Sequence, residues 1–337
     1  MAEKPARNLI TDVEGLRVGH AHDDHLRSGV TVILPDQPAV AAVDVRGGGP
    51  GTRETNALDA AGTISEIHGL ALAGGSAFGL DAATGVQSFL RDRKVGLQFG
   101  DATVPIVPQA ILFDLLNGGN KDWGKRPPYQ DLGYSACEAA SATFQLGSVG
   151  AGYGATTERL KGGLGSASWR GDGATVGALA AVNAAGNVVI GETRHFLAAP
   201  LEVGTEYGGH GWPKVWPEDA NEPRLKGAPN QNTTLCVVAT DAKLERPALL
   251  RLAIMAQAGL ARAIYPVFSP LDGDIIFAIS TGTGEAPDPI WGLARLGVAA
   301  ANTLARAIAR GVYEATAFPG DPDSFPAYRA IFPQTKA

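Results

Sequence analysis

A short polar junction opens onto an apolar run in the segment Asn232-Thr233-Thr234-Leu235-Cys236-Val237-Val238-Ala239-Thr240-Asp241. The run has the length and composition of a buried strand. If the peptide bond before Thr233 were cut, this residue would carry a free α-amine beside its own hydroxyl. Such an amine has a pKa of roughly 7.7–8.0, and a threonine paired with it is a recognised nucleophile. The same junction is also typical of a loop that enters a sheet.

Composition excludes several classes of protein. The chain has 337 residues, of which 45% are hydrophobic and 18% charged, which is enough for one large domain or two. The net charge is −6 without a basic cluster, so neither nucleic acid nor a membrane surface is an expected partner. There is no run of 18 apolar residues and no apolar signal segment in residues 1–38, so we expect a cytoplasmic protein.

Strand and helix patterns alternate along the chain. We expect Ser76 to cap a helix that buries Phe78, Ala82, Val86 and Phe89 on one face. Several strands are hairpin-linked, which favours mixed sheets in a layered α/β domain over a doubly wound one. Residues 202–231 lack periodicity and predict a long loop before the junction. The predicted strands are 30–34, 40–45, 70–73, 178–182, 188–191, 235–240 and 275–281, and the predicted helices are 76–91, 132–144, 246–264 and 290–315.

Asp272-Gly273-Asp274 follows Thr233 by 39 residues. Asp-Gly is a strong hairpin signal, so a plain turn is one interpretation. A pair of carboxylates beside the nucleophile is the other. A calcium loop is excluded because the spaced oxygen ligands and the closing Glu are missing.

Two glycine-rich segments invite other interpretations that their spacing rejects. Residues 74–79 are not a nucleophile elbow, because Phe78 stands where the last Gly is required. Residues 47–52 lack the Lys-Ser/Thr of a phosphate-binding loop, and we interpret them as a turn near the active site. We interpret His20, His22 and His25 as part of a polar loop rather than a metal site, so we expect neither a metal nor a cofactor.

Segments spread over nearly the whole chain resemble the P1 (S58) family of self-processing N-terminal-nucleophile hydrolases. This family contains L-aminopeptidase/D-Ala-esterase/amidase, the β-peptidyl aminopeptidases and the nylon-oligomer endohydrolase. The resemblance implies a four-layer αββα sandwich, one hydrolase domain (1–337) processed to chains 1–232 and 233–337, and a homotetramer. The matching segments are 10–20, 44–48, 72–80, 161–167, the Asn232-Thr233 junction and 272–274.

The resemblance also implies roles for individual residues. Self-cleavage between Asn232 and Thr233 would expose the nucleophile. Asp272 and Asp274 would position its amine and hydroxyl, as in the nylon-hydrolase branch, which carries two aspartates here. Asn183 is similar to the family's oxyanion-stabilising asparagine, although an Asn in the segment Asn183-Ala184-Ala185-Gly186 is also typical of a turn. Lys161 matches a family site lysine, although a lone lysine is ordinarily a solvated surface charge.

Two substrate-binding positions depart from the family pattern. Phe113 stands where relatives often have Tyr, so it brings no hydroxyl to the oxyanion. Gln109 stands where the aminopeptidase branch has a Glu that holds a substrate ammonium. We therefore do not expect strict aminopeptidase specificity.

The implied activity is hydrolysis of peptides or peptide-like amides through an acyl-enzyme on Thr233. Three alternatives remain open from the sequence. One is an endo-acting hydrolase of ω-amino-acid oligomers, and another is an acyltransferase similar to ornithine acetyltransferase. The third is an uncleaved binding protein on the same scaffold.

Overall fold

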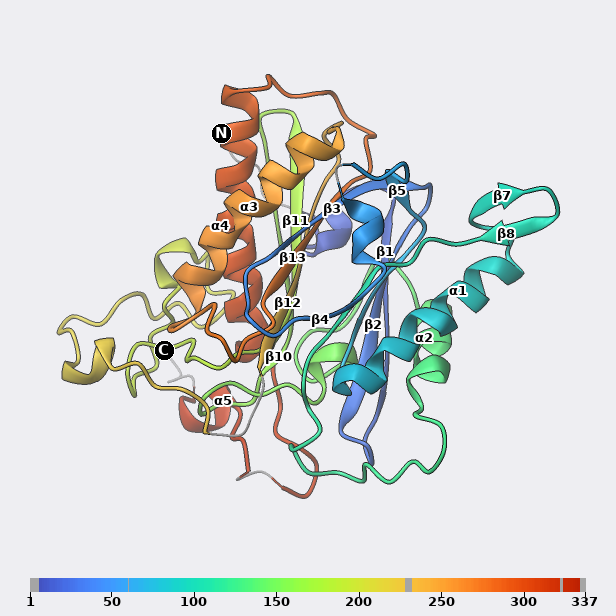
Figure 1. Cartoon of the computed structure of the whole chain (residues 1–337). Coiled ribbons are helices and arrows are strands. Elements are labelled where there is room, and N and C mark those ends of the chain that lie inside the picture. Colours follow the sequence, from blue (N-terminus) through green and yellow to red (C-terminus); the bar gives the residue numbers. More distant parts are fainter. Residues whose placement is uncertain (1–5, 60, 228–231, 322–323, 334–337) are drawn as a thin grey trace.

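Two β-sheets stack face to face between two layers of helices (Figure 1). The computed structural model describes residues 6–59, 61–227, 232–321 and 324–333. Helices α3 and α4 cover the outer face of a six-stranded sheet, and α1 and α2 cover a five-stranded one (Figure 1). The predicted four-layer αββα sandwich is confirmed.

The six-stranded sheet has the order β10-β11-β12-β13-β3-β5. Strands β12 and β13 run parallel, and every other neighbouring pair is antiparallel. Helix α3 provides the crossover that a parallel pair requires. The strands are β3 (Ala39–Val45), β5 (Glu66–Ile67), β10 (Gly163–Gly171), β11 (Ala174–Asn183), β12 (Thr233–Thr240) and β13 (Ile275–Ser280).

The five-stranded sheet has the order β1-β2-β6-β9-β4, with β6 and β9 parallel. A separate two-stranded hairpin projects from the body of the molecule beyond α1 (Figure 1). The strands of the sheet are β1 (Leu16–Asp23), β2 (Ser28–Pro35), β4 (Gly51–Arg53), β6 (Leu70–Ala73) and β9 (Gln109–Ile111), and those of the hairpin are β7 (Leu97–Phe99) and β8 (Ala102–Val104).

The two longest helices pack on each other through small residues. A Cβ at Gly259 of α3 would lie 2.4 Å from the carbonyl oxygen of Ala301 in α4, so the two helix backbones approach closely. The α-helices are α1 (Ala82–Asp92), α2 (Tyr129–Glu138), α3 (Arg246–Ala263), α4 (Trp291–Tyr313) and α5 (Tyr328–Ile331). The 3₁₀ helices are η1 (Ile10–Asp12), η2 (Thr55–Leu58), η3 (Ser76–Asp81), η4 (Gly150–Gly152), η5 (Ala199–Leu201) and η6 (Glu218–Asn221).

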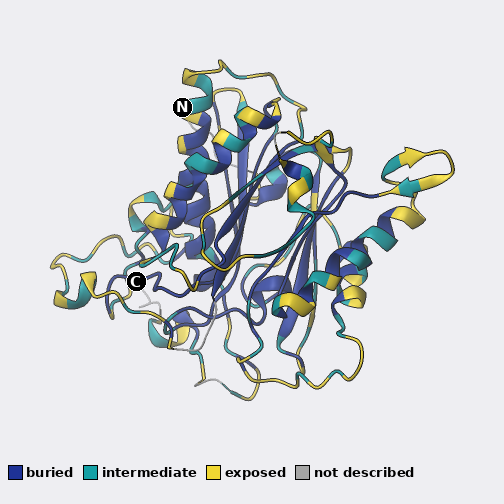
Figure 2. Ribbon diagram, in the orientation of Figure 1, coloured by how far each residue is buried: buried dark blue, intermediate teal, exposed yellow. Residues whose placement is uncertain are grey.

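Three apolar cores separate the four layers, and both sheets are buried on both faces over most of their length (Figure 2). In β12, Leu235, Val237 and Ala239 face the other sheet, whereas Cys236 and Val238 face α3 and α4. This alternation follows from the two-residue period of a strand. It also places Thr233 on the face between the sheets.

The start of the first long helix differs from the sequence prediction. Ser76 is not an N-cap: it has a φ of +52°, follows Gly75 at +81° and begins η3. A Cβ at Gly75 would lie 2.1 Å from the Tyr129 ring, so tertiary packing sets this conformation. Phe78 consequently lies outside the buried face and is 50% exposed, while Ala82, Val86 and Phe89 are buried as predicted.

Two further predictions were wrong: the helix predicted at 132–144 ends earlier, and the strand predicted at 188–191 does not form. Helix α2 ends at Glu138 because the chain then turns to pair with β1, where the Ser141 N–H donates to the Val18 carbonyl. Residues 188–191 form no strand; Asn187 and Val189 make only isolated bridges, with Tyr265 and Phe196. The predicted long loop holds η6 and no strand as far as residue 227, and its residues 228–231 lie outside the described chain.

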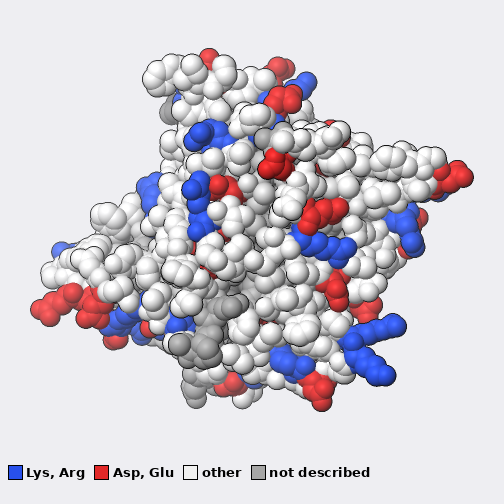
Figure 3. All heavy atoms as spheres, viewed as in Figure 1, with Lys and Arg blue, Asp and Glu red and all other residues white. Residues whose placement is uncertain are grey.

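Charge is dispersed on the face shown in Figure 3, where basic and acidic side chains are interspersed. Within the described residues, no helix combines the length and apolar character needed to cross a bilayer.

Candidate active site

Thr233 begins β12 and is buried at the end of the six-stranded sheet. Its hydroxyl donates to the carbonyl oxygen of Asn232 at 2.5 Å, and the Gly273 N–H donates to the same oxygen at 2.8 Å. A Cβ at Gly273 would lie 2.5 Å from the Thr233 hydroxyl oxygen, so this position requires glycine. The carbonyl before the threonine thus lies between its hydroxyl and a backbone donor.

Asp272, Gly273 and Asp274 lead into β13 and do not form a hairpin, because β12 and β13 are parallel. Asp274 accepts hydrogen bonds from the Thr234 N–H at 2.7 Å and the Phe268 N–H at 3.2 Å. Burial, and secondarily the neighbouring Asp272, raise the pKa of Asp274 to about 7 despite these donors. This carboxyl can therefore exchange a proton near neutral pH.

Asp272 is also buried and accepts a hydrogen bond from the Ser269 N–H at 2.9 Å. Its backbone carbonyl accepts from the Gly49 N–H at 2.8 Å, and that of Asp274 accepts from the Gly47 N–H at 3.1 Å. The glycine-rich turn therefore lies directly against the two aspartates, as its sequence interpretation expected.

Asn183 ends β11 directly opposite Thr233 in the register. Its carboxamide nitrogen Nδ2 donates to the Phe113 carbonyl at 3.0 Å. Its oxygen Oδ1 accepts from the Thr156 N–H at 3.0 Å and from the Lys226 ammonium at 3.2 Å. The side chain is held on three sides and lies beside Thr233.

Lys161 is fully buried, so its interpretation as a surface charge is wrong. Its ammonium donates to the backbone carbonyls of Gly152, Ala155 and Gly162 and lies 4.8 Å from the Phe318 ring centre. Burial lowers the pKa of Lys161 to about 7. Lys161 is therefore held by the backbone of residues 152–162.

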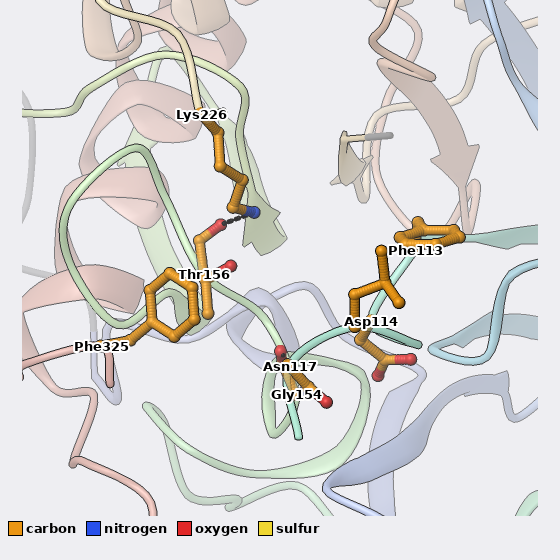
Figure 4. Close-up of a pocket in the computed structure, with 8 residues that line it drawn as sticks. Phe113, Asp114, Asn117, Gly154, Thr156, Lys226 and Phe325 are labelled. Carbon is orange, nitrogen blue, oxygen red and sulfur yellow. Dashed lines mark hydrogen bonds between the residues drawn. The ribbon is translucent and has the colours of Figure 1, made fainter. Parts of the chain in front are cut away.

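A pocket opens beside Asn183, whose side chain bonds to residues of the pocket wall (Figure 4). Its walls are Phe113, Asp114, Leu116, Asn117, Gly154, Thr156, Lys226 and Phe325. The Asp114 carboxylate is buried and accepts hydrogen bonds from the Ser28 hydroxyl and the Gly75 N–H, each at 2.7 Å. Burial raises the pKa of Asp114, and the charge of Lys121 opposes that shift.

The structure does not bring Gln109 into this pocket. The residue is fully buried in β9. Its Oε1 accepts from the Ala83 N–H at 2.9 Å, and its Nε2 donates to the Gly79 carbonyl at 2.5 Å. Both partners belong to the segment that enters α1, so the side chain holds this helix and is not free to contact a substrate. Phe113, in contrast, lines the pocket.

Sequence reasoning missed two members of the site. Asp114 lies in the run Ile111-Leu112-Phe113-Asp114-Leu115-Leu116, where nothing distinguishes it from a loop aspartate. Lys226 lies in the aperiodic loop before the junction. A charged residue six positions before a proposed cut was the available signal.

The fold is shared with the N-terminal-nucleophile hydrolases. The structure of L-aminopeptidase D-Ala-esterase/amidase from Ochrobactrum anthropi, described as a variant of that fold, matches with a TM-score of 0.70 and 21% identity, covering 98% of this chain and 95% of the other. Residues 8–324 match the model of peptidase family S58. The chain belongs to this family and is a hydrolase of peptide or amide bonds.

Two sequence relatives extend the comparison. A protein of Mycobacterium tuberculosis (strain ATCC 25618 / H37Rv) named as an uncharacterized aminopeptidase is 45% identical, covering 97% of this chain and 98% of its own. The 6-aminohexanoate-oligomer endohydrolase of Kocuria sp. (strain KY2) is 28% identical, covering 83% and 76%.

Proposed function

We propose that the chain cleaves itself between Asn232 and Thr233 and that Thr233 then hydrolyses small peptides or peptide-like amides through an acyl-enzyme. The observation that carries this proposal is the Asn232 carbonyl, which accepts hydrogen bonds from both the Thr233 hydroxyl and the Gly273 N–H. These two groups are a nucleophile and an oxyanion donor on one peptide bond.

This geometry supports the following course for the proposed self-cleavage. The Thr233 oxygen attacks the Asn232 carbonyl carbon, its proton passes to Asp274, and the Gly273 N–H stabilises the oxyanion. Collapse breaks the C–N bond, returns the proton to the leaving amine and leaves an ester. Water then hydrolyses the ester to the Asn232 carboxylate and a free Thr233 amine. A pKa of about 7 suits Asp274 to accept and return this proton.

In turnover, the Thr233 amine takes the proton of the hydroxyl, which attacks the substrate carbonyl. Asn183 Nδ2 carries two hydrogens, and one of them goes to Phe113. We assign the other to the substrate oxyanion. The amine protonates the leaving group, and water releases the acyl group from Thr233. Asp272 and Asp274 hold the loop around the nucleophile.

The two chains, 1–232 and 233–337, would remain one hydrolase domain because their strands alternate in the same sheet. Strands β12 and β13 of the second chain lie between β11 and β3 of the first. Separation would break two antiparallel strand pairs and expose two buried faces. We also propose a homotetramer, which light scattering would test.

A second candidate is endo-acting hydrolysis of ω-amino-acid oligomers. It is favoured by the absence of a Gln109 contact to the pocket, since the substrate ammonium then lacks that partner. Comparing a free with an N-acetylated aminoacyl p-nitroanilide, and each with a 6-aminohexanoate oligomer, separates exo from endo action. Adding an acceptor amino acid to an acylated amine separates hydrolysis from acyl transfer.

A denaturing gel with N-terminal sequencing tests the proposal. Scaling 34.7 kDa by 232/337 and 105/337 gives fragments of about 24 and 11 kDa. We expect the smaller fragment to begin at Thr233, and Thr233→Ala to stay uncut and inactive. A full-length band that retains its activity in Thr233→Ala would refute both steps.

A further inference from the structure

Lys226 is the one residue of the loop before the proposed cut that the structure ties to the oxyanion donor, within the described part of that loop (202–227). Its backbone N–H donates to the Ala185 carbonyl at 2.9 Å, two residues beyond Asn183. Its side chain is buried and lines the pocket (Figure 4). The loop is therefore anchored at this point independently of the lysine side chain.

The Lys226 ammonium donates to the Thr156 carbonyl at 3.0 Å and to Asn183 Oδ1 at 3.2 Å. The Thr156 N–H donates to the same Oδ1 at 3.0 Å. Two donors thus define which end of the carboxamide is oxygen. A flipped amide would direct its NH₂ group at both donors and lose its bond to the Phe113 carbonyl, so the network fixes one orientation.

The surroundings of Lys226 combine burial with opposite charge. Burial lowers the pKa of Lys226 to about 7, while Asp272 and Asp114 act in the opposite direction. Lys161 lies close enough for the two cations to affect each other. A hydrogen bond from a cation to Oδ1 withdraws electron density from the amide, which strengthens the opposite N–H as a donor.

We propose that Lys226 is a positioning residue for amide hydrolysis: it holds Asn183 Oδ1 so that Nδ2 faces the substrate oxyanion. This proposal rests on the proposed function, in which Thr233 is the nucleophile. The proposal for Lys226 gives the two oxyanion donors different roles. The Gly273 N–H serves self-cleavage, since it already binds the Asn232 carbonyl. Asn183, supported by Lys226, serves turnover of substrate.

Lys226→Met tests this division because methionine keeps the length of the side chain and removes its donors. We expect self-cleavage to proceed to the wild-type extent, whereas kcat for alanine p-nitroanilide falls at least about tenfold with KM within about threefold. Loss of a whole oxyanion donor costs about 10²–10³ in kcat, and misorientation of one costs part of that. Lys226→Arg retains a cationic donor and should restore part of the kcat.

Lys214→Met is the matched control, since Lys214 is an exposed lysine of the same loop. It should match the wild type in self-cleavage and kcat. Thermal unfolding of all variants shows whether a loss of kcat follows a loss of fold.

Three results overturn the proposal. They are a kcat of Lys226→Met within about twofold of the wild type, failure of Lys226→Met to cleave itself, and equal losses in the Met and Arg variants in step with their melting temperatures. The proposed function is refuted separately if Thr233→Ala is active, independently of the results with the Lys226 variants.

Discussion

The two sheets use polar side chains in opposite ways. In the six-stranded sheet, Thr233 and Asn183 follow the alternation of the residues that face the other sheet, and they lie opposite each other at the end of two neighbouring strands. In the five-stranded sheet, Ala110 faces the space between the sheets, so Gln109 faces α1 and its polar atoms bond there. Successive residues of a strand face opposite sides of the sheet, so a shift of one position decides whether a polar side chain faces the site or packs within the fold.

The largest expected effect comes from the tight contact between Gly273 and Thr233. Gly273→Ala would place a Cβ 2.5 Å from the Thr233 hydroxyl oxygen and force it away from the Asn232 carbonyl. We expect the chain to stay full-length on a denaturing gel and to lack measurable amidase activity. Gly227→Ala is the control, because a Cβ there meets nothing within 4 Å. Normal cleavage in Gly273→Ala would show that this geometry is not used.

The next effect concerns the turn before β13. Asp274→Asn retains an acceptor for the Thr234 N–H but cannot exchange a proton. We expect cleavage and turnover to fall by at least about a hundredfold, the low end for a positioned proton-transfer group. Asp272→Asn should lower turnover similarly if both carboxylates position the nucleophile. Gel densitometry measures the rate of cleavage, and release of p-nitroaniline measures turnover. Near-normal rates in both variants would mean that Asp272-Gly273-Asp274 is only a structural turn.

Much of the sheet that carries the site was predictable from the sequence. The strands 235–240 and 275–281 and the helices 246–264 and 290–315 have apolar runs and lengths that identify them. The glycine-rich turn at 47–49 and the aspartates at 272–274 were each predicted near the site, and they contact each other.

The faces of the strands were not predictable. Both sides of β9 and β12 are buried, so an apolar residue stands at nearly every position and hydrophobic alternation gives no sign of which face a side chain occupies. The role expected for Gln109 failed for this reason. The capping role expected for Ser76 failed for another reason: the preceding Gly75 packs against Tyr129, which is distant in sequence, so no local capping pattern shows it. The contacts of Lys226 could not be predicted from its place in the loop, because its partners lie at Thr156 and Asn183.

A smaller effect is the pH dependence of stability. The pKa of Asp274 is about 7 in the folded chain and roughly 3.9 in an unfolded one. The folded state therefore binds more protons between these values, and this carboxyl costs stability as pH rises from about 4 to 7. In an uncut Thr233→Ala background, adding Asp274→Asn should become progressively more stabilising over that interval. Urea unfolding at several pH values measures this, and a difference that stays constant with pH would contradict the raised pKa.

The smallest expected effect on catalysis is at Gln109. Substitutions there test the difference between the two sheets directly. Gln109→Ala leaves the Ala83 N–H and the Gly79 carbonyl buried without this partner, so we expect a loss of about 1–3 kcal/mol in the free energy of unfolding. The side chain faces α1, so the ratio of kcat/KM for a free and an N-acetylated aminoacyl p-nitroanilide should change by less than about twofold.

Gln109→Glu provides the sharper test. A carboxylate there cannot donate to the Gly79 carbonyl and should destabilise the fold without increasing preference for the free amine. A marked gain in that preference would mean that position 109 faces the substrate, and that strand parity does not divide the two sheets as this structure indicates.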